Sequence, residues 1–420
     1  MRVLYLIFLC LASLAFIAVV PGVSATDYVL EIFGNANMDE DIDDADISYV
    51  QEIISGKSKP TELADANQDG RIDSSDLDRI GKIINGEEKE LTIVDAQGRN
   101  VTLNVPIKRA IAINSGSMEI MRAIGTDLKT VLVGVTSYAL KDPLYWPELQ
   151  DKASITYGSP DYEQIAKLKP DLVILYKKPY KDESFEKFET IKVPVISLNC
   201  HDQETLYSDI QILGELFNKK ENAKNLIDWC QDYRNKIQER TADLSEDKKL
   251  KVMFYSFPDT YYPILKARTG ESGIQATLEG AGAINIASDL NSSSGTADVD
   301  SEWVIAANPD VIIGSLSAGE AKTGYSANES AIEYMKNVRD TLLNDSAIKL
   351  TNAGKDGKVF IICTDLNRGP MEVAGMAYLA KYFYPDLFED LNPQKILEDY
   401  FEDWQGIAYR GSYVYPEIKR

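Results

Sequence analysis

The chain carries two short acidic loops whose side chains could bind a cation. The second loop, DANQDGRIDSSD, spans residues 65–76 and places Asp or Asn at its first, third and fifth positions, with Asp again at its ninth and twelfth. Calcium takes six to eight hard oxygen ligands, which this spacing supplies together with the backbone carbonyl of the seventh residue. Gly70, at the sixth position, permits the sharp turn of such a loop. The predicted calcium ligands are Asp65, Asn67, Asp69, Arg71, Asp73 and Asp76.

The same pattern occurs 30 residues earlier, in NANMDEDIDDAD at residues 35–46. Apolar residues at i, i+3, i+6 and i+7 follow both loops with the same offset and predict one amphipathic helix after each loop. Glycine ends both helical patterns, at Gly56 and Gly86. Because Glu40 replaces the glycine of the turn, we expect weaker calcium binding here. The predicted ligands are Asn35, Asn37, Asp39, Asp41, Asp43 and Asp46.

Together the two units resemble a type I dockerin, whose loops end in Asp rather than in the Glu of an EF-hand. The resemblance covers about residues 27–86 and rests on the duplicated loop and helix pattern. It implies a small α-helical domain at 26–86 with two EF-hand-like Ca²⁺ sites, followed by a linker at 87–90. It also implies calcium-dependent binding to a cohesin domain on another protein. Neither unit can bury its apolar face alone. The two are therefore expected to pack against each other, and bound calcium is expected to stabilise the small domain that they form.

The first 25 residues predict a secretory signal peptide. Arg2 precedes an apolar run that ends in small residues, and Val23 and Ala25 suit a cleavage site, so the mature chain would begin at Thr26. An uncleaved anchor helix is the alternative, because the apolar run is long. No later segment has the ~18 unbroken apolar residues of a membrane span. We therefore expect a secreted, extracytoplasmic protein associated with the cell surface.

Charge and cysteine usage narrow the function classes. The net charge is −22, and residues 26–90 hold 18 acidic and 6 basic residues, a net charge of −12. A segment with so many acidic residues is expected to be disordered or to bind cations. The sequence has no cluster of basic residues that would favour binding to nucleic acid. The cysteines after residue 25 are odd in number and form no CxxC pair, which predicts mostly buried thiols.

After residue 90 the pattern changes to alternating strands and helices. LTIVDAQGRNVTLNV predicts two strands about a turn at 96–98, and short apolar runs then recur between helical patterns, in DLVILY, VPVISL, KVMFYSF, DVIIGS and KVFIIC. Such runs are typical of parallel strands that are buried on both faces. Residues 219–243 contain no Gly or Pro. They predict a helix of ~37 Å, which is long enough to join two lobes.

An internal echo supports two similar lobes. YEQIAKLKPDLVIL (162–175) and SEWVIAANPDVIIG (301–314) share a Glu, an apolar residue two positions later, and Pro-Asp seven and eight positions later. Each pattern predicts a helix that stops at the proline and leads into a buried strand. Because the two segments stand on either side of the long helix, they indicate paired lobes.

Residues 91–420 resemble the substrate-binding proteins of ABC importers that carry ferric siderophores, haem or cobalamin. The resemblance is carried by TIVDAQGRNVTL, VLVGVTSY, YGSPDYEQIAKLKPDLVI, SEWVIAANPDVIIG and NRGPMEVAGMAYLAKYFYPDLF. It implies an α/β fold of two Rossmann-like lobes, at about 91–200 and 249–420, joined by a long backbone helix in a bridging region at about 202–247. It further implies a ligand between the lobes, an ABC permease as membrane partner, and no catalytic activity.

The same resemblance implies functional residues on both lobes. In this family a Glu on each lobe docks onto arginines of the permease, and the matching positions are Glu163 and Glu302, whose carboxylates suit an arginine fork. Alternatively, each is a helix-start charge that favours the helix dipole. The predicted ligand-binding residues are Tyr138, Tyr157, Tyr176, Tyr255, Tyr262 and Arg368. Aromatic walls suit a large flat chelate and arginine suits its anionic oxygens, although tyrosines at strand ends are also common at core edges.

These residues favour an iron chelate of the ferric-siderophore type as the ligand, with a corrinoid as the alternative. Thr296 stands where a vitamin B12-binding relative has an aromatic residue, which weakens the corrinoid hypothesis. His201 is the only histidine, which disfavours haem. The chain has neither G-x-S-x-G nor HExxH, so serine hydrolase and zincin activities are not expected. A glycosidase with two catalytic carboxylates is not excluded by motif, because such enzymes need only Asp or Glu residues, which are frequent in this sequence. A purely structural cell-surface protein is the remaining alternative.

Overall fold

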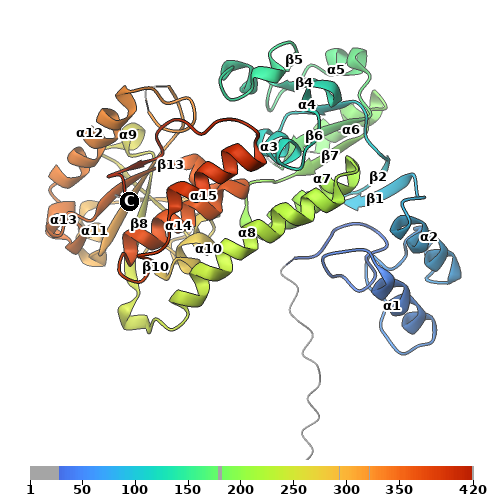
Figure 1. Cartoon of the computed structure of the whole chain (residues 1–420), viewed down its shortest axis with the longest axis horizontal. Coiled ribbons are helices and arrows are strands. Elements are labelled where there is room, and N and C mark those ends of the chain that lie inside the picture. The colour runs from blue at the N-terminus through green and yellow to red at the C-terminus, as the bar shows by residue number, and fades with distance from the viewer. Residues whose placement is uncertain (1–27, 178–181, 293, 321, 419–420) are drawn as a thin grey trace, which may run out of the picture.

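The computed structural model describes residues 28–177, 182–292, 294–320 and 322–418 (Figure 1). The predicted signal peptide and its cleavage site lie outside the described residues. Among the helices that are described, none combines the length and the apolar character needed to cross a membrane.

A five-stranded sheet forms the N-lobe. All of its strand pairs are parallel, and most of its strand residues are buried, as the continuous apolar runs predict. The strand order is β5 (Ala153–Ile155), β4 (Leu132–Thr136), β3 (Ala110–Ala112), β6 (Leu172–Tyr176) and β7 (Val195–Leu198). The helices of this lobe are α3 (Ser115–Ala123), α4 (Leu128–Val131), α5 (Tyr162–Leu168), α6 (Asp182–Thr190) and α7 (Gln203–Leu216).

The C-lobe has a mixed sheet. Its central strands are parallel, whereas β9, β11 and β14 pair antiparallel to their neighbours. The strand order is β11 (Thr296–Val299), β9 (Leu265–Arg268), β8 (Leu250–Ser256), β12 (Val311–Leu316), β13 (Val359–Cys363) and β14 (Val414–Tyr415), with β10 (Ala283–Asn285) beside β8. The helices are α9 (Pro258–Tyr261), α10 (Ile274–Gly280), α11 (Ser301–Ala307), α12 (Ser330–Asn344), α13 (Asn352–Lys355), α14 (Glu372–Phe383) and α15 (Pro393–Asp399).

The predicted backbone helix is confirmed as α8 (Lys220–Thr241), which runs along both lobes (Figure 1). Its buried face packs against α7 of the N-lobe and against α14 and α10 of the C-lobe. Arg234 on α8 pairs with the buried carboxylate of Glu372 on α14 at 2.9 Å, and Thr277 on α10 donates its hydroxyl to the same carboxylate at 2.7 Å. This buried network holds α8 on the C-lobe, because removing one partner of a buried ion pair strongly destabilises the folded state.

The internal echo forms the same structure twice. Helices α5 and α11 both end in a left-handed residue, Lys169 with φ 47° and Asn308 with φ 43°, before the proline. The following Asp171 and Asp310 each accept a backbone N–H from the start of a neighbouring strand, at 2.9 and 3.0 Å. The two lobes therefore share this helix–strand corner, as the sequence predicts.

The N-terminal region forms two loop–helix units with α1 (Asp44–Ile54) and α2 (Ser74–Ile84). Each helix begins with a capping box between the ninth and twelfth loop residues, Asp43 with Asp46 and Asp73 with Asp76. The two helices pack against each other. We refer to residues 28–86 as the loop–helix module.

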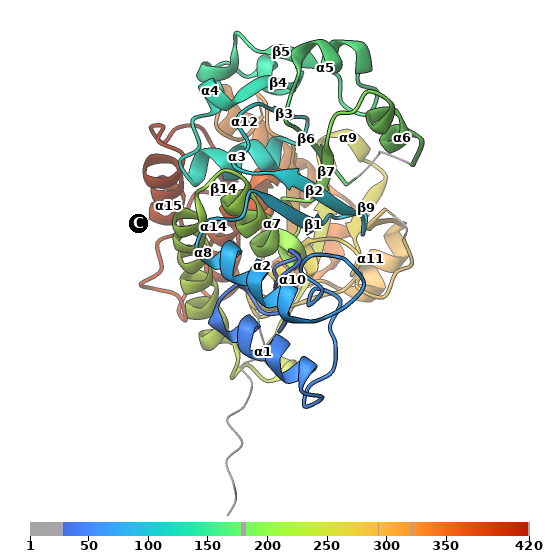
Figure 2. The ribbon, with the colours of Figure 1, turned by 90° about the vertical axis from the view of Figure 1, so that its right-hand side faces the viewer.

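The segment predicted as a linker at 87–90 joins the module to the next strand, with no helix or strand at 87–89. Glu90 is already the first residue of β1 (Glu90–Val94), which forms a hairpin with β2 (Asn100–Asn104). Ile32 of the module bridges to Ile93 of β1, and the backbone N–H of Phe33 donates to the carbonyl of Thr92 at 2.9 Å. Apolar residues of the module and of the hairpin belong to one hydrophobic core. The module therefore packs directly on the N-lobe, below the hairpin in Figure 2.

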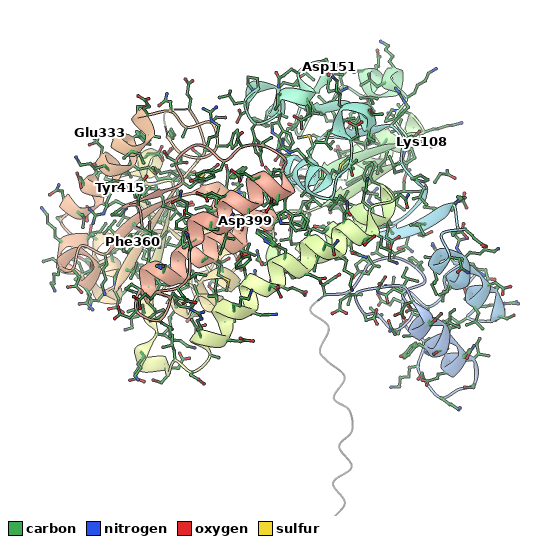
Figure 3. The ribbon with its side chains drawn as sticks, in the orientation of Figure 1. Lys108, Asp151, Glu333, Phe360, Asp399 and Tyr415 are labelled. Atoms are coloured by element: carbon green, nitrogen blue, oxygen red, sulfur yellow. The ribbon has the colours of Figure 1, made fainter. Side chains whose placement is uncertain are left out.

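A second contact fixes the module to the backbone helix. The carboxylate of Asp41 in the first loop lies 2.9 Å from the ammonium of Lys220, which begins α8, and the same ammonium lies 3.1 Å from Glu215. By contrast, charged residues such as Lys108, Asp151 and Glu333 are exposed on the outer surface (Figure 3).

Candidate ligand-binding cleft and calcium loops

Three predicted ligand-binding tyrosines lie together on the N-lobe. Tyr138 follows β4, Tyr157 follows β5 and Tyr176 ends β6, and the carboxyl ends of parallel strands meet at one edge of a sheet. The rings of Tyr138 and Tyr157 meet edge to face with centroids 6.3 Å apart. The ring of Tyr176 lies 5.5 Å from the imidazole of His201, which follows β7. Tyr138 is 62% exposed, so an aromatic surface is available at this edge.

Two arginines of the C-lobe belong to the same site. The predicted Arg368 follows β13, and its charge contributes to the electrostatic environment of both Tyr176 and His201. Arg268 is the last residue of β9; burial, and then the charge of Arg368, lower its pKa. Neither arginine takes part in an ion pair within the described part of the chain. The charges of the two guanidinium groups repel each other, and Arg368 also lowers the pKa of its acidic neighbours Asp365 and Glu119.

Two acidic side chains, Glu119 and Asp365, lie near Arg368. Burial raises the pKa of Glu119 to about 7, and the neighbouring Asp365 adds to the rise. Burial likewise raises the pKa of Asp365. Both carboxyls therefore hold their protons more tightly than usual, although the charge of Arg368 opposes the rise in each.

The other two predicted tyrosines do not join this cluster. Tyr255 is fully buried in β8 and donates its hydroxyl to the carbonyl of Ile264 at 2.8 Å, so its prediction as a cleft residue is wrong. Tyr262 is 38% exposed but lies beside Asp345 at the end of α12, with 3.5 Å between its hydroxyl and the carboxylate. The second lobe therefore contributes cations, rather than these two rings, to the site.

Sequence reasoning missed Arg268 and treated His201 as structural. Arg268 lies on an antiparallel strand that no apolar run indicates, and its guanidinium lies 6.0 Å from the ring centroid of Phe257. His201 sits against Gly116, where a Cβ would come within 2.5 Å of the imidazole. Its Nε2 is buried and has no hydrogen-bond partner among the described residues, and burial lowers its pKa to about 3. The imidazole is therefore neutral, and its Nε2 is buried against Gly116.

Both predicted docking residues are exposed. Glu163 and Glu302 stand in the first turns of α5 and α11, and both helices lie on the right-hand side of Figure 2. The side chain of Glu163 is 88% exposed and approaches only Lys167, at 4.0 Å. Both carboxylates are thus accessible to a partner.

The two acidic loops adopt the same local conformation. In each loop the backbone N–H of the third residue donates to the side chain of the twelfth at 3.1 Å, and the N–H of the ninth donates to the same carboxylate at 2.8 Å. The fourth residues, Met38 and Gln68, are both left-handed, with φ 59° and 57°. Burial raises the pKa of Asp46 to about 6 and raises that of Asp76, and the neighbouring carboxylates of each loop add to the rise. The oxygen-rich donor set therefore fits calcium chemistry.

The loops differ where the sequence departs from the repeat. Gly70 adopts φ 84°, whereas Glu40 at the equivalent position is not left-handed. The amide nitrogen of Asn35 donates to the carbonyls of Leu30 and Asp39 at 2.9 and 2.6 Å, so this side chain also holds the chain together. Within the described ranges, no group of three or more His, Cys, Asp or Glu side chains is assembled as a metal site.

The three described cysteines, at 200, 230 and 363, are buried and unpaired, which confirms their prediction as thiols.

Comparisons with known proteins agree with this architecture. Residues 111–366 match the family described as periplasmic binding protein. The molybdate-binding protein MolA of Haemophilus influenzae is 26% identical over 343 residues, which cover 74% of this chain and 90% of MolA. The ferric-anguibactin-binding protein FatB of Vibrio anguillarum is 23% identical over 275 residues, which cover 64% of this chain and 78% of FatB.

A solved structure shows the same fold. The TroA-like periplasmic binding protein FepB from Veillonella parvula superposes with a TM-score of 0.63 at 21% identity, covering 77% of this chain and 98% of that protein. The family match spans more than half of the chain and includes both lobes. The chain therefore belongs to the periplasmic binding protein family.

Proposed function

We propose that this protein captures an anionic metal complex, an iron chelate of the ferric-siderophore type, outside the cytoplasm and delivers it to an ABC permease. The observation that carries this proposal is that Arg368 lies near enough to Arg268 of its own lobe and to Tyr176 of the N-lobe to influence the pKa of both, and that Tyr157 likewise influences Tyr176. Arginine forks bind catecholate, hydroxamate or carboxylate oxygens, and the tyrosine rings pack on the flat ligand framework. FatB, named for a ferric siderophore, supports this ligand class.

A small oxyanion such as molybdate is the second candidate. The same two arginines and the unpartnered Nε2 of His201 would suit a compact tetrahedral anion. MolA, named for molybdate, is the relative with higher identity and coverage. No observation in the cleft favours a corrinoid, since the small side chain of Thr296 supplies no aromatic wall.

The test is a titration of the full chain with ferric siderophores, molybdate, haem and cobalamin, each followed by Trp and Tyr fluorescence. We expect saturable binding of a ferric siderophore. Arg268→Gln and Arg368→Gln should each weaken it by about 10–100-fold, the loss of one charge-assisted hydrogen bond. Arg410→Gln, an exposed arginine of the same lobe, is the control. Binding of molybdate alone would transfer the proposal to the oxyanion, and binding that survives both arginine substitutions would contradict an anionic ligand.

We further propose that the loop–helix module binds calcium and attaches the protein to a cohesin domain at the cell surface. The duplicated loops support this, with their side-chain oxygens and the carbonyl of the seventh residue as ligands. Bound calcium would supply the positive charge that holds the carboxylates of each loop together. A purified cohesin domain on a resin should retain the full chain in Ca²⁺ and release it in excess EGTA. Retention in EGTA would contradict the attachment.

Asp65→Ala with Asp69→Ala tests the second loop in the same assay. The matched pair Asn35→Ala with Asp39→Ala tests the first. We expect the second-loop variant to lose more binding, because Gly70 permits the calcium turn there.

A further inference from the structure

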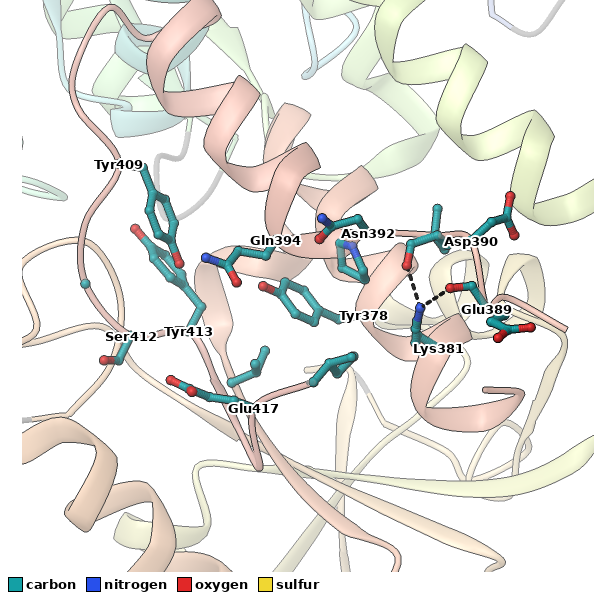
Figure 4. A pocket seen from close by; sticks show the side chains of 15 residues that line it. Tyr378, Lys381, Glu389, Asp390, Asn392, Gln394, Tyr409, Ser412, Tyr413 and Glu417 are labelled. Atoms are coloured by element: carbon teal, nitrogen blue, oxygen red, sulfur yellow. Dashed lines mark hydrogen bonds between the residues drawn. The ribbon is translucent and has the colours of Figure 1, made fainter. Parts of the chain in front are cut away.

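A cavity lies in the C-lobe, apart from the cleft residues. Its volume is about 350 Å³, within the range of small-ligand pockets. Helix α14, the start of α15 and the C-terminal segment at 409–418 surround it (Figure 4). Neither the cleft tyrosines nor the cleft arginines line it.

The inner wall of this cavity presents an unpartnered hydroxyl. Tyr378 on α14 is only 4% exposed, and its phenol points toward the middle of the cavity (Figure 4). No hydrogen bond of this hydroxyl is drawn in Figure 4. The hydroxyl of Tyr413, which also lines the cavity, is buried and has no partner within the described residues, although buried hydroxyls normally have one. Burial also raises the pKa of Tyr378, so the group remains a protonated donor. A ligand hydroxyl or a water molecule would satisfy it.

Aromatic rings and amides form the other walls. The rings of Tyr409 and Tyr413 stack with centroids 6.0 Å apart, and both line the cavity. Gln394 lines it as well; its amide nitrogen donates to Glu398 at 2.8 Å, and its amide carbonyl accepts no protein donor among the described hydrogen bonds. Rings beside amide groups suit the C–H faces and the hydroxyls of one sugar ring.

The charges exclude an anion and disfavour a cation. The ammonium of Lys381 donates to the carbonyls of Glu389 and Leu391 at 2.8 and 2.7 Å, so it is already occupied. The carboxylates that line the cavity, those of Glu389, Asp390 and Glu417, are exposed and thus hydrated at the rim. A buried cation would need carboxylates inside the cavity, whereas the interior holds neutral donors and acceptors.

We propose that this cavity binds a neutral sugar of one or two rings, independently of the ligand in the cleft. Tyr378 would donate to a sugar hydroxyl, Gln394 would accept from another, and Tyr409 would cover one face of the ring.

Calorimetric titration of the full chain with glucose, galactose, N-acetylglucosamine and cellobiose tests the proposal, with tetramethylammonium as the cation probe. We expect one sugar to bind at 1:1 stoichiometry. Tyr378→Phe, which removes a single hydroxyl, should weaken binding about tenfold. Gln394→Ala provides a second variant should Tyr378→Phe disturb folding. Tyr162→Phe on α5 of the N-lobe is the matched control, and Arg368→Gln should leave sugar binding unchanged.

The contrary outcomes are equally concrete. Binding of tetramethylammonium in place of the sugars, no binding of any sugar at tens of millimolar, or sugar binding that both cavity variants retain would each overturn the proposal.

Discussion

At the scale of single residues, the junction between the lobes regulates its charge by protonation. Glu119 and Asp365 are gathered near Arg368, and burial holds both carboxyls above their ordinary pKa. The folded protein therefore binds a proton at Glu119 more tightly than the unfolded chain does. Below pH 4.5 this residue is protonated in both states and exerts no penalty, whereas between pH 4.5 and 7 the unfolded chain ionises while the folded protein keeps the proton, so stability falls as the pH rises.

Replacing Glu119 with Gln should therefore flatten the pH dependence of stability. We expect the free energy of unfolding of the native protein to fall, relative to Glu119→Gln, by about 1–3 kcal/mol between pH 4.5 and pH 7.5. Urea unfolding at four pH values in this range measures the difference. Glu333→Gln, on the exposed face of α12, is the control. Parallel curves for the native protein and Glu119→Gln would contradict the buried carboxyl as the cause.

At the scale of elements, local patterns predicted what local interactions determine. The helix–proline–strand echo, the backbone helix and the β1–β2 hairpin all formed as the sequence indicates. Strands β9 and β11 did not show in the sequence, because LKAR and TADV are short, mixed in polarity and only half-buried. Arg268 was missed for that reason.

The failure at Tyr255 has a different cause. The last five residues of β8 are all buried, so alternation gives no sign of which side chains face the cleft. The family resemblance predicts tyrosines at the ends of strands. Whether a given ring faces the cleft or the hydrophobic core depends on tertiary packing, which the sequence pattern does not show. The packing of the loop–helix module on the N-lobe likewise depends on contacts distant in sequence, such as Ile32 with Ile93.

Helices α5 and α11 offer a prediction about the permease. If the two carboxylates dock as the family resemblance implies, Glu163→Lys combined with Glu302→Lys should abolish ligand-stimulated ATP hydrolysis by the reconstituted permease, because like charges would then face the permease arginines. Ligand affinity should change less than twofold, since neither residue lies in the cleft cluster. Glu333→Lys on α12 is a charge-matched control on another exposed helix. Full stimulation by the double variant would show that these carboxylates serve only their own helices.

At the scale of the whole molecule, the loop–helix module packs on the N-lobe and shares a hydrophobic core with it. The bridge between Ile32 and Ile93 extends the β1–β2 hairpin, and Asp41 is paired with Lys220 on α8. Anything that stabilises the module should consequently stabilise the lobe that it covers.

Calcium should therefore raise the melting temperature of the N-lobe as well as that of the module. A free calcium concentration about 100 times the dissociation constant contributes about 2.7 kcal/mol. Scanning calorimetry in Ca²⁺ and in EGTA measures the shift, and Asp65→Ala with Asp69→Ala should reduce it. A separate low-temperature transition that alone responds to calcium would show that the module unfolds independently.

The direct packing of the module also determines how far the bound protein can reach. A flexible linker allows a tethered domain to move through the volume within the linker's reach. The domain then has a high effective concentration near any binding partner inside that volume. Here the strand-like contact to β1 and the Asp41–Lys220 pair remove that freedom. A partner that binds the module would therefore hold the cleft in a fixed orientation. The distance between that partner and the permease would then decide whether the ligand can be transferred while the protein stays bound, or only after the protein dissociates.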